Sequence, residues 1–204
     1  GIRSEALIAG LDSIAEMTEA LATFFRYTIS NLENLVTLED ELANIENYYY
    51  IQQFRFGSKL DLKIQYDRDP DDDFTEMDFL QCKLPKLTLQ PIVENSVNHG
   101  IREMNGEGKI RLKVYHVDGD TLGISIRDNG IGMDRDTIEK VLGGNYHEEQ
   151  SGGGSNGIAM GNVIARLKLF TQNEDVMTIL SDGKDQGTEV ILYLPIKERE
   201  KTDV

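Results

Sequence analysis

The stretch LQPIVENSVNHG, residues 89 to 100, is a largely apolar run with the length of a helix and a cluster of polar side chains toward its end. These side chains are Glu94, Asn95, Asn98 and His99. Polar groups in such a setting usually bind a ligand. The amide oxygen of Asn95 suits Mg²⁺, which also binds substrate phosphates, and Glu94 could orient or deprotonate a nucleophile. Taken alone, a Glu-Asn pair on a helix more often faces solvent, and a histidine beside a glycine is more often a helix-end residue.

A second motif, DNGIGM at residues 128 to 133, follows a strand-like run. Glycines at positions 130 and 132 let the backbone approach a planar ligand closely, while the Asp128 carboxylate accepts a hydrogen bond from it. Adenine fits this arrangement. The alternative is a tight turn between a strand and a helix, for which Asp-Asn-Gly is a common sequence.

A third motif is the glycine-rich run GGGSNG, residues 152 to 157, which opens a helical stretch. Its unhindered backbone N–H groups and the helix N-terminus suit a phosphate. Alone, such a run is as often a flexible linker. It is not a P-loop, because no Gly-Lys-Ser or Gly-Lys-Thr follows.

The composition is that of an ordinary globular protein with an acidic surface. Acidic residues outnumber basic ones by 36 to 21, which argues against a nucleic-acid binder because neutralising phosphates needs clustered Lys and Arg. The acidic run at residues 67 to 73 indicates a solvated turn rather than a metal-binding loop. With Cys82 as its one cysteine, the chain has no internal disulfide or cysteine metal site, and we expect Cys82 to be a small apolar filler.

The sequence also bears on location. No apolar run approaches the roughly 20 residues that span a bilayer, and the N-terminus lacks the basic and apolar regions of a signal peptide. We therefore expect a soluble chain in a reducing, cytoplasmic compartment. It could be the cytoplasmic portion of a membrane-anchored protein, with the membrane segment upstream.

The first 57 residues carry two amphipathic helical patterns. Apolar residues recur at steps of three and four from Leu7 to Leu32, which predicts one long helix. A capping box at residues 37 to 40 starts a second helix, which Gly57 closes. The two helices predict an antiparallel hairpin that pairs with another copy as a four-helix bundle, because one hairpin cannot bury both stripes. The alternative is that the helices pack on the following domain.

From residue 58 onward, strand patterns alternate with helical ones. Pro85 is expected in the first turn of a helix that runs to about residue 101. Strands are expected at residues 60 to 66, 109 to 117, 122 to 127, 176 to 180 and 188 to 194, helices at 134 to 142 and 158 to 171, and a loop at 143 to 156. This order predicts an α+β two-layer sandwich with helices on one face of a mixed sheet. The predicted parts are a hairpin at residues 1 to 57, a domain at 58 to 198 and a charged tail at 199 to 204.

The order of these motifs resembles that of the GHKL, or Bergerat-fold, ATPases, and among them the LytS-type sensor histidine kinases. The run LTLQPIVENSVNHG is similar to their asparagine box, Phe25-Arg26-Tyr27 with residues 38 to 56 to their helical hairpin, and GTEVILYLP to their closing strand. The resemblance covers nearly the whole chain. It implies a Bergerat-fold α/β sandwich that binds ATP and Mg²⁺.

The resemblance implies a role for each motif residue. On the phosphate side, Asn95 is the expected Mg²⁺ ligand, Glu94 its catalytic acidic neighbour, and Asn98 and His99 lie near the phosphates, with His99 also catalytic. On the adenine side, Asp128 reads the amino group and Thr188 supports it through a hydrogen bond or water. The other residues expected to contact the nucleotide are Gly130, Gly132, Met133, Gly157, Gly161 and Asn162. Residues 143 to 156 are the expected lid over the triphosphate.

Two departures from the family pattern stand out. Where the family repeats Gly-x-Gly, this chain has Gly157-Ile158-Ala159, which adds a methyl group at a site of close backbone approach. Aligning the first helix on Leu11-Asp-Ser-Ile14 places Glu5 at the position of the phosphoacceptor histidine. A carboxylate is a poor substitute for an imidazole nucleophile. The chain's three histidines, His99, His116 and His147, all lie outside the hairpin.

The resemblance leaves more than one function open. The first is a histidine kinase module for two-component signalling, a homodimer or heterodimer through the hairpin, with a response-regulator receiver domain as partner. The second is a pseudokinase that binds ATP or regulates a partner kinase without phosphorylating itself, which Glu5 and Ala159 favour. A protein-serine kinase of the same superfamily fits less well, because those proteins usually lack the long hairpin.

Overall fold

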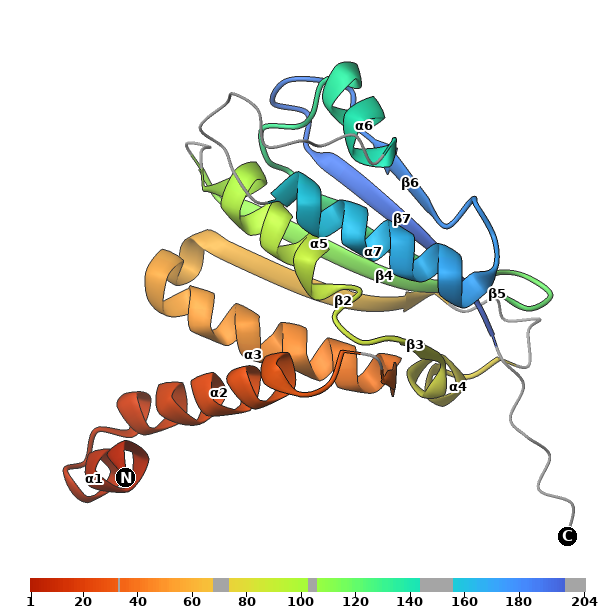
Figure 1. The fold of residues 1–204 in the computed structure, drawn as a ribbon. Helices are drawn as coiled ribbons and strands as arrows, with labels where there is room; N and C mark the ends of the chain where they lie inside the picture. The colour runs from red at the N-terminus through yellow and green to blue at the C-terminus, as the bar shows by residue number, and fades with distance from the viewer. Residues whose placement is uncertain (33, 68–73, 103–105, 144–155, 197–204) are drawn as a thin grey trace, which may run out of the picture.

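A five-stranded mixed sheet forms one layer of the molecule, and helices cover one of its faces (Figure 1). The computed structural model describes residues 1–196 except 33, 68–73, 103–105 and 144–155. The strands lie in the order β2-β4-β5-β7-β6. Strand β2 is parallel to β4, and the other neighbours are antiparallel. The predicted α+β two-layer sandwich with a mixed sheet is therefore confirmed.

The strands form where the sequence alternates apolar and polar residues. Their bounds are β2 Leu60–Asp67, β4 Gly108–Asp118, β5 Thr121–Asp128, β6 Met177–Leu180 and β7 Thr188–Pro195, close to the predicted ranges. Along β7, buried and half-buried residues alternate strictly, because successive side chains of a strand point to opposite faces of its sheet. The apolar face of the sheet thereby forms one side of the hydrophobic core.

The helices on that face are α3 Leu38–Phe56, α5 Gln90–Asn95 and α7 Asn156–Thr171, with α6 Arg135–Leu142 at one end (Figure 1). The capping box predicted for α3 is present, since Thr37 Oγ1 accepts a hydrogen bond from the Asp40 N–H and the Asp40 carboxylate accepts one from the Thr37 N–H. Gly57 ends the helix at a φ of 60°. The predictions for α6 and α7 are also confirmed.

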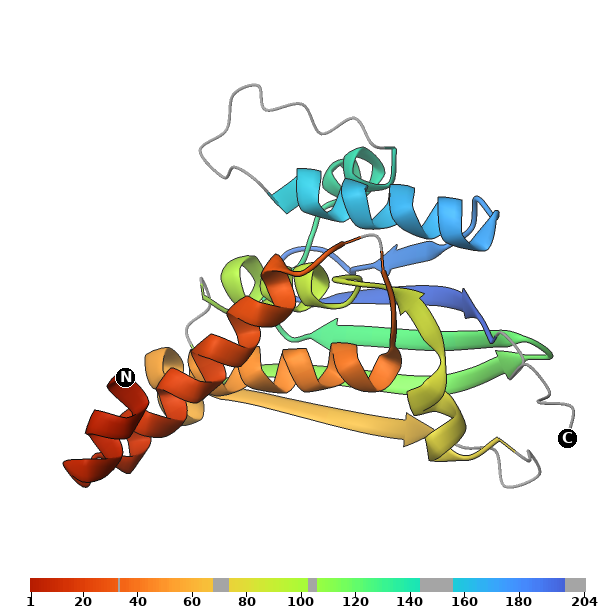
Figure 2. The same ribbon diagram turned by 60° about the horizontal axis from the view of Figure 1, so that its bottom comes forward.

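The prediction of one long first helix is wrong, because this segment forms two helices. Helix α1 Ile2–Ile8 and helix α2 Asp12–Ile29 are separated by Gly10, whose φ of 68° lies in the left-handed region that favours glycine. Leu11 N–H donates back to the Ala6 carbonyl at 2.8 Å, which closes the end of α1. Figure 2 shows α1 beside the start of α2 instead of extending it.

Helix α3 shares its core with the sheet. Its buried residues Leu38, Leu42, Ile45 and Tyr48 belong to the same hydrophobic cluster as the strands. Packing on the following domain, the alternative considered for the hairpin, therefore describes α3. Helix α2 lies against α3 and leaves Ile14, among others, about half exposed. Dimerisation through the hairpin and the division after residue 57 stay predictions.

The segment before α5 differs from the prediction. Residues Lys83–Pro85 form a short strand, β3, paired antiparallel with β1 Leu35–Thr37. The helix begins only at Gln90, with Pro91 in its first turn. Pro85 therefore does not start the helix, because its segment is extended and held by β1, and Leu87 turns the chain at a φ of 56°. A π-helical turn, Ser96–Ile101, continues α5. Strand β1 and helix α4 Glu76–Gln81 were not predicted.

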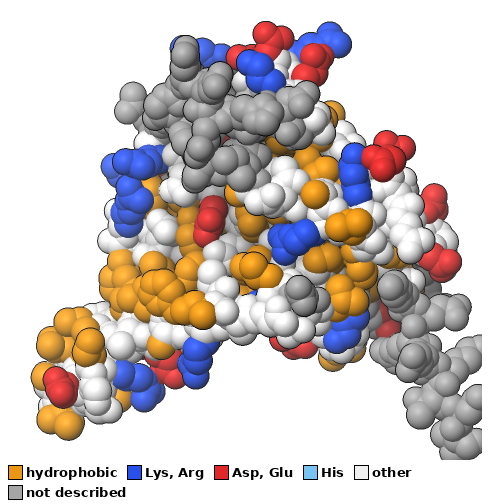
Figure 3. Space-filling view, in the orientation of Figure 1, with side chains coloured by type: hydrophobic (Ala, Val, Ile, Leu, Met, Phe, Trp, Pro, Cys, Tyr) orange, Lys and Arg blue, Asp and Glu red, His pale blue; other side chains and the backbone are white. Residues whose placement is uncertain are grey.

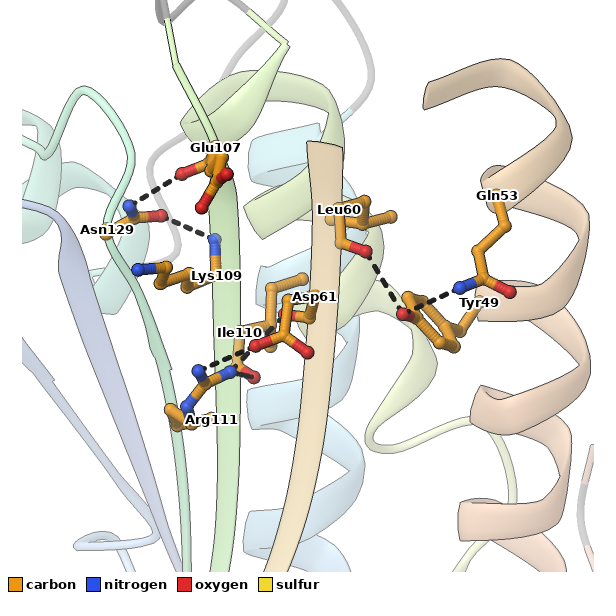
Figure 4. A network of polar contacts seen from close by, with 9 residues as sticks. All are labelled: Tyr49, Gln53, Leu60, Asp61, Glu107, Lys109, Ile110, Arg111 and Asn129. Atoms are coloured by element: carbon orange, nitrogen blue, oxygen red, sulfur yellow. Dashed lines mark hydrogen bonds and ion pairs between the residues drawn. The ribbon is translucent and has the colours of Figure 1, made fainter. Parts of the chain in front are cut away.

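Side chains anchor the edge strand β2 on both sides (Figure 4). On one side, Arg111 of β4 donates to the Asp61 carboxylate at 2.7 Å. On the other, Tyr49 of α3 donates its hydroxyl to the Leu60 carbonyl at 3.0 Å and accepts a hydrogen bond from the Gln53 amide at 2.8 Å. These contacts fix α3 to the sheet at the point where β2 begins.

Three smaller predictions concern the surface and Cys82. Cys82 packs in the core, where burial raises the pKa of its thiol to about 11, which confirms the apolar filler. Asp67 ends β2 in an ion pair with Lys113 at 2.5 Å, and the rest of the acidic run lies outside the described residues. Among the helices that the structure describes, none is both long and apolar enough to cross a membrane.

Candidate functional site

Asp128 ends strand β5 as a buried carboxylate, with 5% of its surface exposed. Its Oδ1 accepts hydrogen bonds from the backbone N–H groups of Gly130 at 2.9 Å and Thr188 at 3.2 Å. Its Oδ2 accepts one from the Ser96 hydroxyl at 2.8 Å. Burial raises the pKa of Asp128 above its usual value, although these hydrogen bonds oppose the shift. A held acceptor of this kind suits a ligand that presents an amino group.

The asparagine-box helix and the DNGIGM motif interlock at Asp128. A Cβ added to Gly130 would lie 2.3 Å from the backbone of Gly100, and Ile131 N–H donates to the Gly100 carbonyl at 3.0 Å. Gly132, at a φ of 74°, lies against the Gly183 carbonyl, which an added Cβ would approach to 2.1 Å. The close neighbours of both glycines are therefore other backbone segments of the protein. Their predicted contact with a purine stays a prediction.

The loop between β6 and β7 is hydrogen-bonded to the DNGIGM motif. We call the place where this loop, the DNGIGM motif and the asparagine-box helix meet the Asp128 junction. Ser181 Oγ accepts a hydrogen bond from the Met133 N–H at 3.0 Å and donates one to the Gly187 carbonyl at 2.7 Å. Gly187 N–H in turn donates to the Gly130 carbonyl at 3.0 Å. Three motifs that are far apart in the sequence thus meet around Asp128. Of Thr188, it is the backbone N–H that supports the Asp128 carboxylate.

Asn129, which follows Asp128 in the DNGIGM motif, is hydrogen-bonded to Glu107 and Lys109 (Figure 4). Its Oδ1 accepts a hydrogen bond from the Lys109 N–H at 2.6 Å, and its Nδ2 donates to the Glu107 carbonyl at 2.9 Å. Asn129 therefore tethers the start of β4. The Asp-Asn-Gly sequence makes the tight connection considered as its alternative, and it also places the Asp128 carboxylate.

On α5, Glu94 is partly exposed and is held by its own helix. Gln90 Nε2 donates to Glu94 Oε1 at 2.7 Å, and Asn44 Nδ2 of α3 donates to Gln90 Oε1 at 2.5 Å. Burial, and then the charge of Glu94, raise the pKa of Tyr48 on α3. Glu94 therefore faces the hairpin helix α3, whereas Ser96, two residues later, faces Asp128.

A carboxylate from α3 holds the turn that leads into α5. Glu41, 1% exposed, accepts hydrogen bonds from the N–H groups of Leu87 at 2.7 Å, Thr88 at 2.9 Å and Leu89 at 2.9 Å. These contacts give buried backbone N–H groups of the turn a charged acceptor just before α5 begins. The hydroxyl of Tyr27 on α2 donates to the same carboxylate at 2.5 Å. Burial, followed by Glu41, raises the pKa of Tyr27, so the hydroxyl stays a donor.

The turn before α5 is a meeting point of four helices. The Lys86 ammonium, on a side chain 2% exposed, donates to the Ser30 carbonyl and hydroxyl at the end of α2 and lies 4.6 Å from the centre of the Tyr27 ring. Arg166 of α7 donates to the carbonyls of Lys86 and Leu87. The asparagine-box helix is thus positioned from α2, α3 and α7 together.

The remaining predicted residues are less defined. Asn95 and Asn98 are partly exposed on α5 and the π-helical turn, where His99 also lies, although its side chain is outside what the structure describes. On α7, Gly161 is partly buried and Asn162 exposed, and a Cβ on Gly161 would meet nothing within 4 Å. The side chains around Gly157 and the lid at residues 144–155 lie outside the described residues. The roles expected for these residues stay predictions.

Sequence reasoning missed Glu41, Gln90 and Ser96. Each pairs with a residue that is distant in the sequence or one helical turn away, so no local motif marks it. The only available signal was a charged or amide side chain on the apolar face of a predicted helix, as at Glu41 and Gln90. Such groups are generally buried where other residues supply their hydrogen-bond partners.

Comparison with known families adds to this geometry. Residues 85–198 match the family model described as histidine kinase-, DNA gyrase B- and HSP90-like ATPase. The chain belongs to this ATPase family. Residues 1–60 match the histidine kinase family. The predictions of histidine kinase family membership and of a GHKL ATPase fold are confirmed. ATP binding follows from the family for the domain that contains the Asp128 junction.

Individual proteins agree with the family assignment. The sensor histidine kinase YpdA of Escherichia coli strain K12 is 31% identical over 186 residues, which cover 90% of this chain and 29% of that protein. The sensor protein LytS of Streptococcus agalactiae is 32% identical over 181 residues, which cover 88% of this chain and 28% of that protein. The chain thus spans less than a third of these relatives.

Among solved structures, the histidine kinase domain of the blue-light activated histidine kinase EL346 from Erythrobacter litoralis superposes with a TM-score of 0.51 at 14% identity. The match covers 93% of this chain and 82% of that one. The similarity extends across both the helical hairpin and the ATPase domain. It shows a shared fold.

Proposed function

We propose that this chain is the ATP- and Mg²⁺-binding catalytic module of a LytS-type sensor histidine kinase, which transfers the γ-phosphoryl group of ATP in two-component signalling. The observation that carries this proposal is the Asp128 junction. A buried carboxylate, held by Ser96, Gly130 and Thr188, stands where the asparagine box, the DNGIGM motif and the closing strand meet. Three of the motifs that resemble the family's ATP site thereby meet at this carboxylate.

In this proposal each end of the site has a separate task. The Asp128 carboxylate accepts a hydrogen bond from the adenine amino group, which selects the base and orients the nucleotide. On α5, the amide oxygen of Asn95 would hold Mg²⁺, and the Glu94 carboxylate would orient the attacking group. When bound, Mg²⁺ offsets the charge that gathers on the phosphate oxygens. The protein contributes mainly positioning and charge stabilisation, as is general for phosphoryl transfer.

The test is nucleotide binding measured by calorimetry. ATP with Mg²⁺ should bind at micromolar to millimolar strength, and Asp128→Ala and Asn95→Ala should each abolish binding. Asp118→Ala, at the exposed turn between β4 and β5, serves as the control and should bind normally. Unchanged affinity in both site variants would refute this assignment of the site.

The proposed partners are a second hairpin and a receiver domain. Helices α1 and α2 and the turn between them expose apolar side chains that the rest of the described chain leaves uncovered, and hydrophobic side chains gather over these helices at the lower left of Figure 3. The exposed side chains include Ile2, Leu7, Ile8, Leu11, Ile14, Phe25 and Ile29. A second copy, or a related kinase, would cover them in a four-helix bundle. The receiver domain of a response regulator would then take the phosphoryl group, in the cytoplasm below a membrane-anchored sensor.

A second candidate is an ATP-binding pseudokinase or regulatory scaffold. It is favoured by Glu5, which occupies the position aligned with the acceptor histidine and is exposed on α1. Incubation with γ-labelled ATP distinguishes the two functions. A pseudokinase gives no acid-labile phosphohistidine, and Glu5→His should restore labelling and transfer to a receiver domain. Strong labelling of the unsubstituted chain would exclude the pseudokinase.

A further inference from the structure

A line of three amide and carboxylate side chains joins the hairpin to the phosphate end of the proposed site. Asn44 on α3 donates to Gln90 at 2.5 Å, and Gln90 donates to Glu94 at 2.7 Å. Asn44 and Gln90 are 3% and 6% exposed, so water competes little for these bonds. We infer that Gln90 is a positioning residue through which hairpin helix α3 sets the orientation of the Glu94 carboxylate. This inference rests on the proposed function.

The chemistry of the groups gives this line a fixed direction. An ionised Glu94 can only accept hydrogen bonds, so Gln90 must turn its NH₂ group toward it. Gln90 then presents its oxygen to α3, and Asn44 must answer with its own NH₂ group. The remaining oxygen, Asn44 Oδ1, is buried without a hydrogen-bond partner among the described residues. A buried polar atom left unpaired is costly, and the fixed direction of the line accounts for it.

The same face of α3 also fixes the start of α5. Glu41 lies three residues before Asn44, so both side chains project from one face of the helix. Glu41 holds the N–H groups of residues 87 to 89, and Asn44 holds the first residue of α5. A shift of α3 along or about its axis therefore acts on α5 at two points. One of those points continues to Glu94.

The adenine end has no such link to α3 among its described hydrogen bonds. Asp128 is held by Ser96, Gly130 and Thr188, all of which lie in the ATPase domain. A change in α3 should therefore alter the phosphate end and leave adenine recognition intact. The hairpin would in this way control phosphoryl transfer without releasing the nucleotide.

Asn44→Asp tests the direction of the line with almost no change in size. An aspartate can only accept, so Gln90 must rotate its NH₂ group toward position 44 and withdraw it from Glu94. The matched control is Asn47→Asp, because among the described residues the Asn47 amide donates to the Ala43 carbonyl on its own helix, at 3.0 Å, and not to α5. The readout is the side-chain carboxyl carbon signal of Glu94 in ¹³C-glutamate-labelled protein. We expect it to move in Asn44→Asp and to stay in Asn47→Asp.

A second readout separates positioning from general damage. The rate of labelling by γ-labelled ATP with Mg²⁺, measured in the Glu5→His chain, should fall about fivefold when Asn44→Asp is added, as for one lost hydrogen bond, while ATP and adenosine affinities stay unchanged. Equal losses for ATP and adenosine, or an unmoved Glu94 signal, would overturn the inference. If Asn44→Asp does not fold, Gln90→Met takes its place with the same two readouts.

The inference and the proposed function can fail separately. If the unsubstituted chain binds no ATP, the proposed function fails, and the Glu94 signal still decides whether Asn44 acts on Glu94 through Gln90. If ATP binds but the signal does not respond to position 44, only the inference fails.

Discussion

The adenine end and the phosphate end of the proposed site are held by different parts of the molecule. Asp128 takes its hydrogen bonds from the π-helical turn, the DNGIGM motif and strand β7, all within the ATPase domain. Glu94 and the start of α5 take theirs from α3, with α2 and α7 contributing to the turn before it. In the proposed site, base recognition would therefore depend on the ATPase domain alone, whereas the phosphate end would depend on α3 as well.

Removing Glu41 should have the largest effect on this arrangement. Glu41→Ala leaves the N–H groups of residues 87 to 89 and the Tyr27 hydroxyl without their acceptor in a buried place. Each buried donor left without its acceptor costs about 1 to 3 kcal/mol. Urea unfolding of Glu41→Ala measures this cost, with Glu46→Ala, on the exposed side of the same helix, as control. Equal stabilities would show that Glu41 of α3 does not hold the turn before α5.

A methyl group at the centre of the adenine end should come next in size. In Gly130→Ala the new Cβ would meet the Gly100 backbone at 2.3 Å, which neither segment can avoid without moving. Overpacking of this kind costs about 1 to 3 kcal/mol, and we expect ATP binding to be lost with it. Gly161→Ala is the matched control for stability alone, because its Cβ has open space. Equal stabilities of the two variants in urea unfolding would contradict the close packing of Gly130 on Gly100.

Ser96→Ala tests whether Asp128 depends on the asparagine-box helix. Loss of the hydroxyl that donates to Asp128 at 2.8 Å removes a hydrogen bond to a charged group, which is worth about 1.5 kcal/mol or more. Adenosine affinity should fall about tenfold, with the Mg²⁺-dependent gain for ATP unchanged. Ser125→Ala, on the same strand as Asp128 but bonded to Glu189, is the control. A loss confined to the Mg²⁺-dependent gain would contradict the division into two ends.

The smallest expected effect is a pH dependence of stability. Burial raises the pKa of Asp128 above 3.8, so the folded state favours the protonated form. The free energy of unfolding of the wild-type protein should therefore fall as the pH rises from about 3.8 through the raised pKa of Asp128. The total loss is about 1.4 kcal/mol for each unit by which that pKa is raised. Asp128→Asn does not ionise, and its amide could donate to Ser96.

Urea unfolding from acidic to neutral pH should thus show the two proteins diverging in favour of Asp128→Asn, while the variant loses ATP binding. Parallel pH profiles would mean that the buried carboxylate carries no such penalty. The unfolding and binding measurements together distinguish the stability lost by burying the Asp128 carboxylate from its contribution to ATP binding.

Much of the fold followed from local patterns. The strand ranges, helix α3 with its Thr37 capping box and Gly57 end, and helices α6 and α7 were all visible as periodicity and capping sequences. The errors fell where a distant partner overrides a local signal. Pro85 is typical of the first turn of a helix, but its segment pairs with β1 as a strand. The apolar periodicity that predicted one long first helix continues across Gly10, where the chain turns.

The sequence by itself determined most of the elements, the two-layer class and the motifs that predict an ATP site at residues 89 to 100 and at Asp128. These depend on neighbours within a helical turn or along one strand, which a single sequence displays. Only the tertiary structure decided that Glu41 and Asn44 reach across to α5, and that Ser96 reaches Asp128. Buried hydrogen bonds between such distant residues exist only once packing has excluded water and brought their elements together.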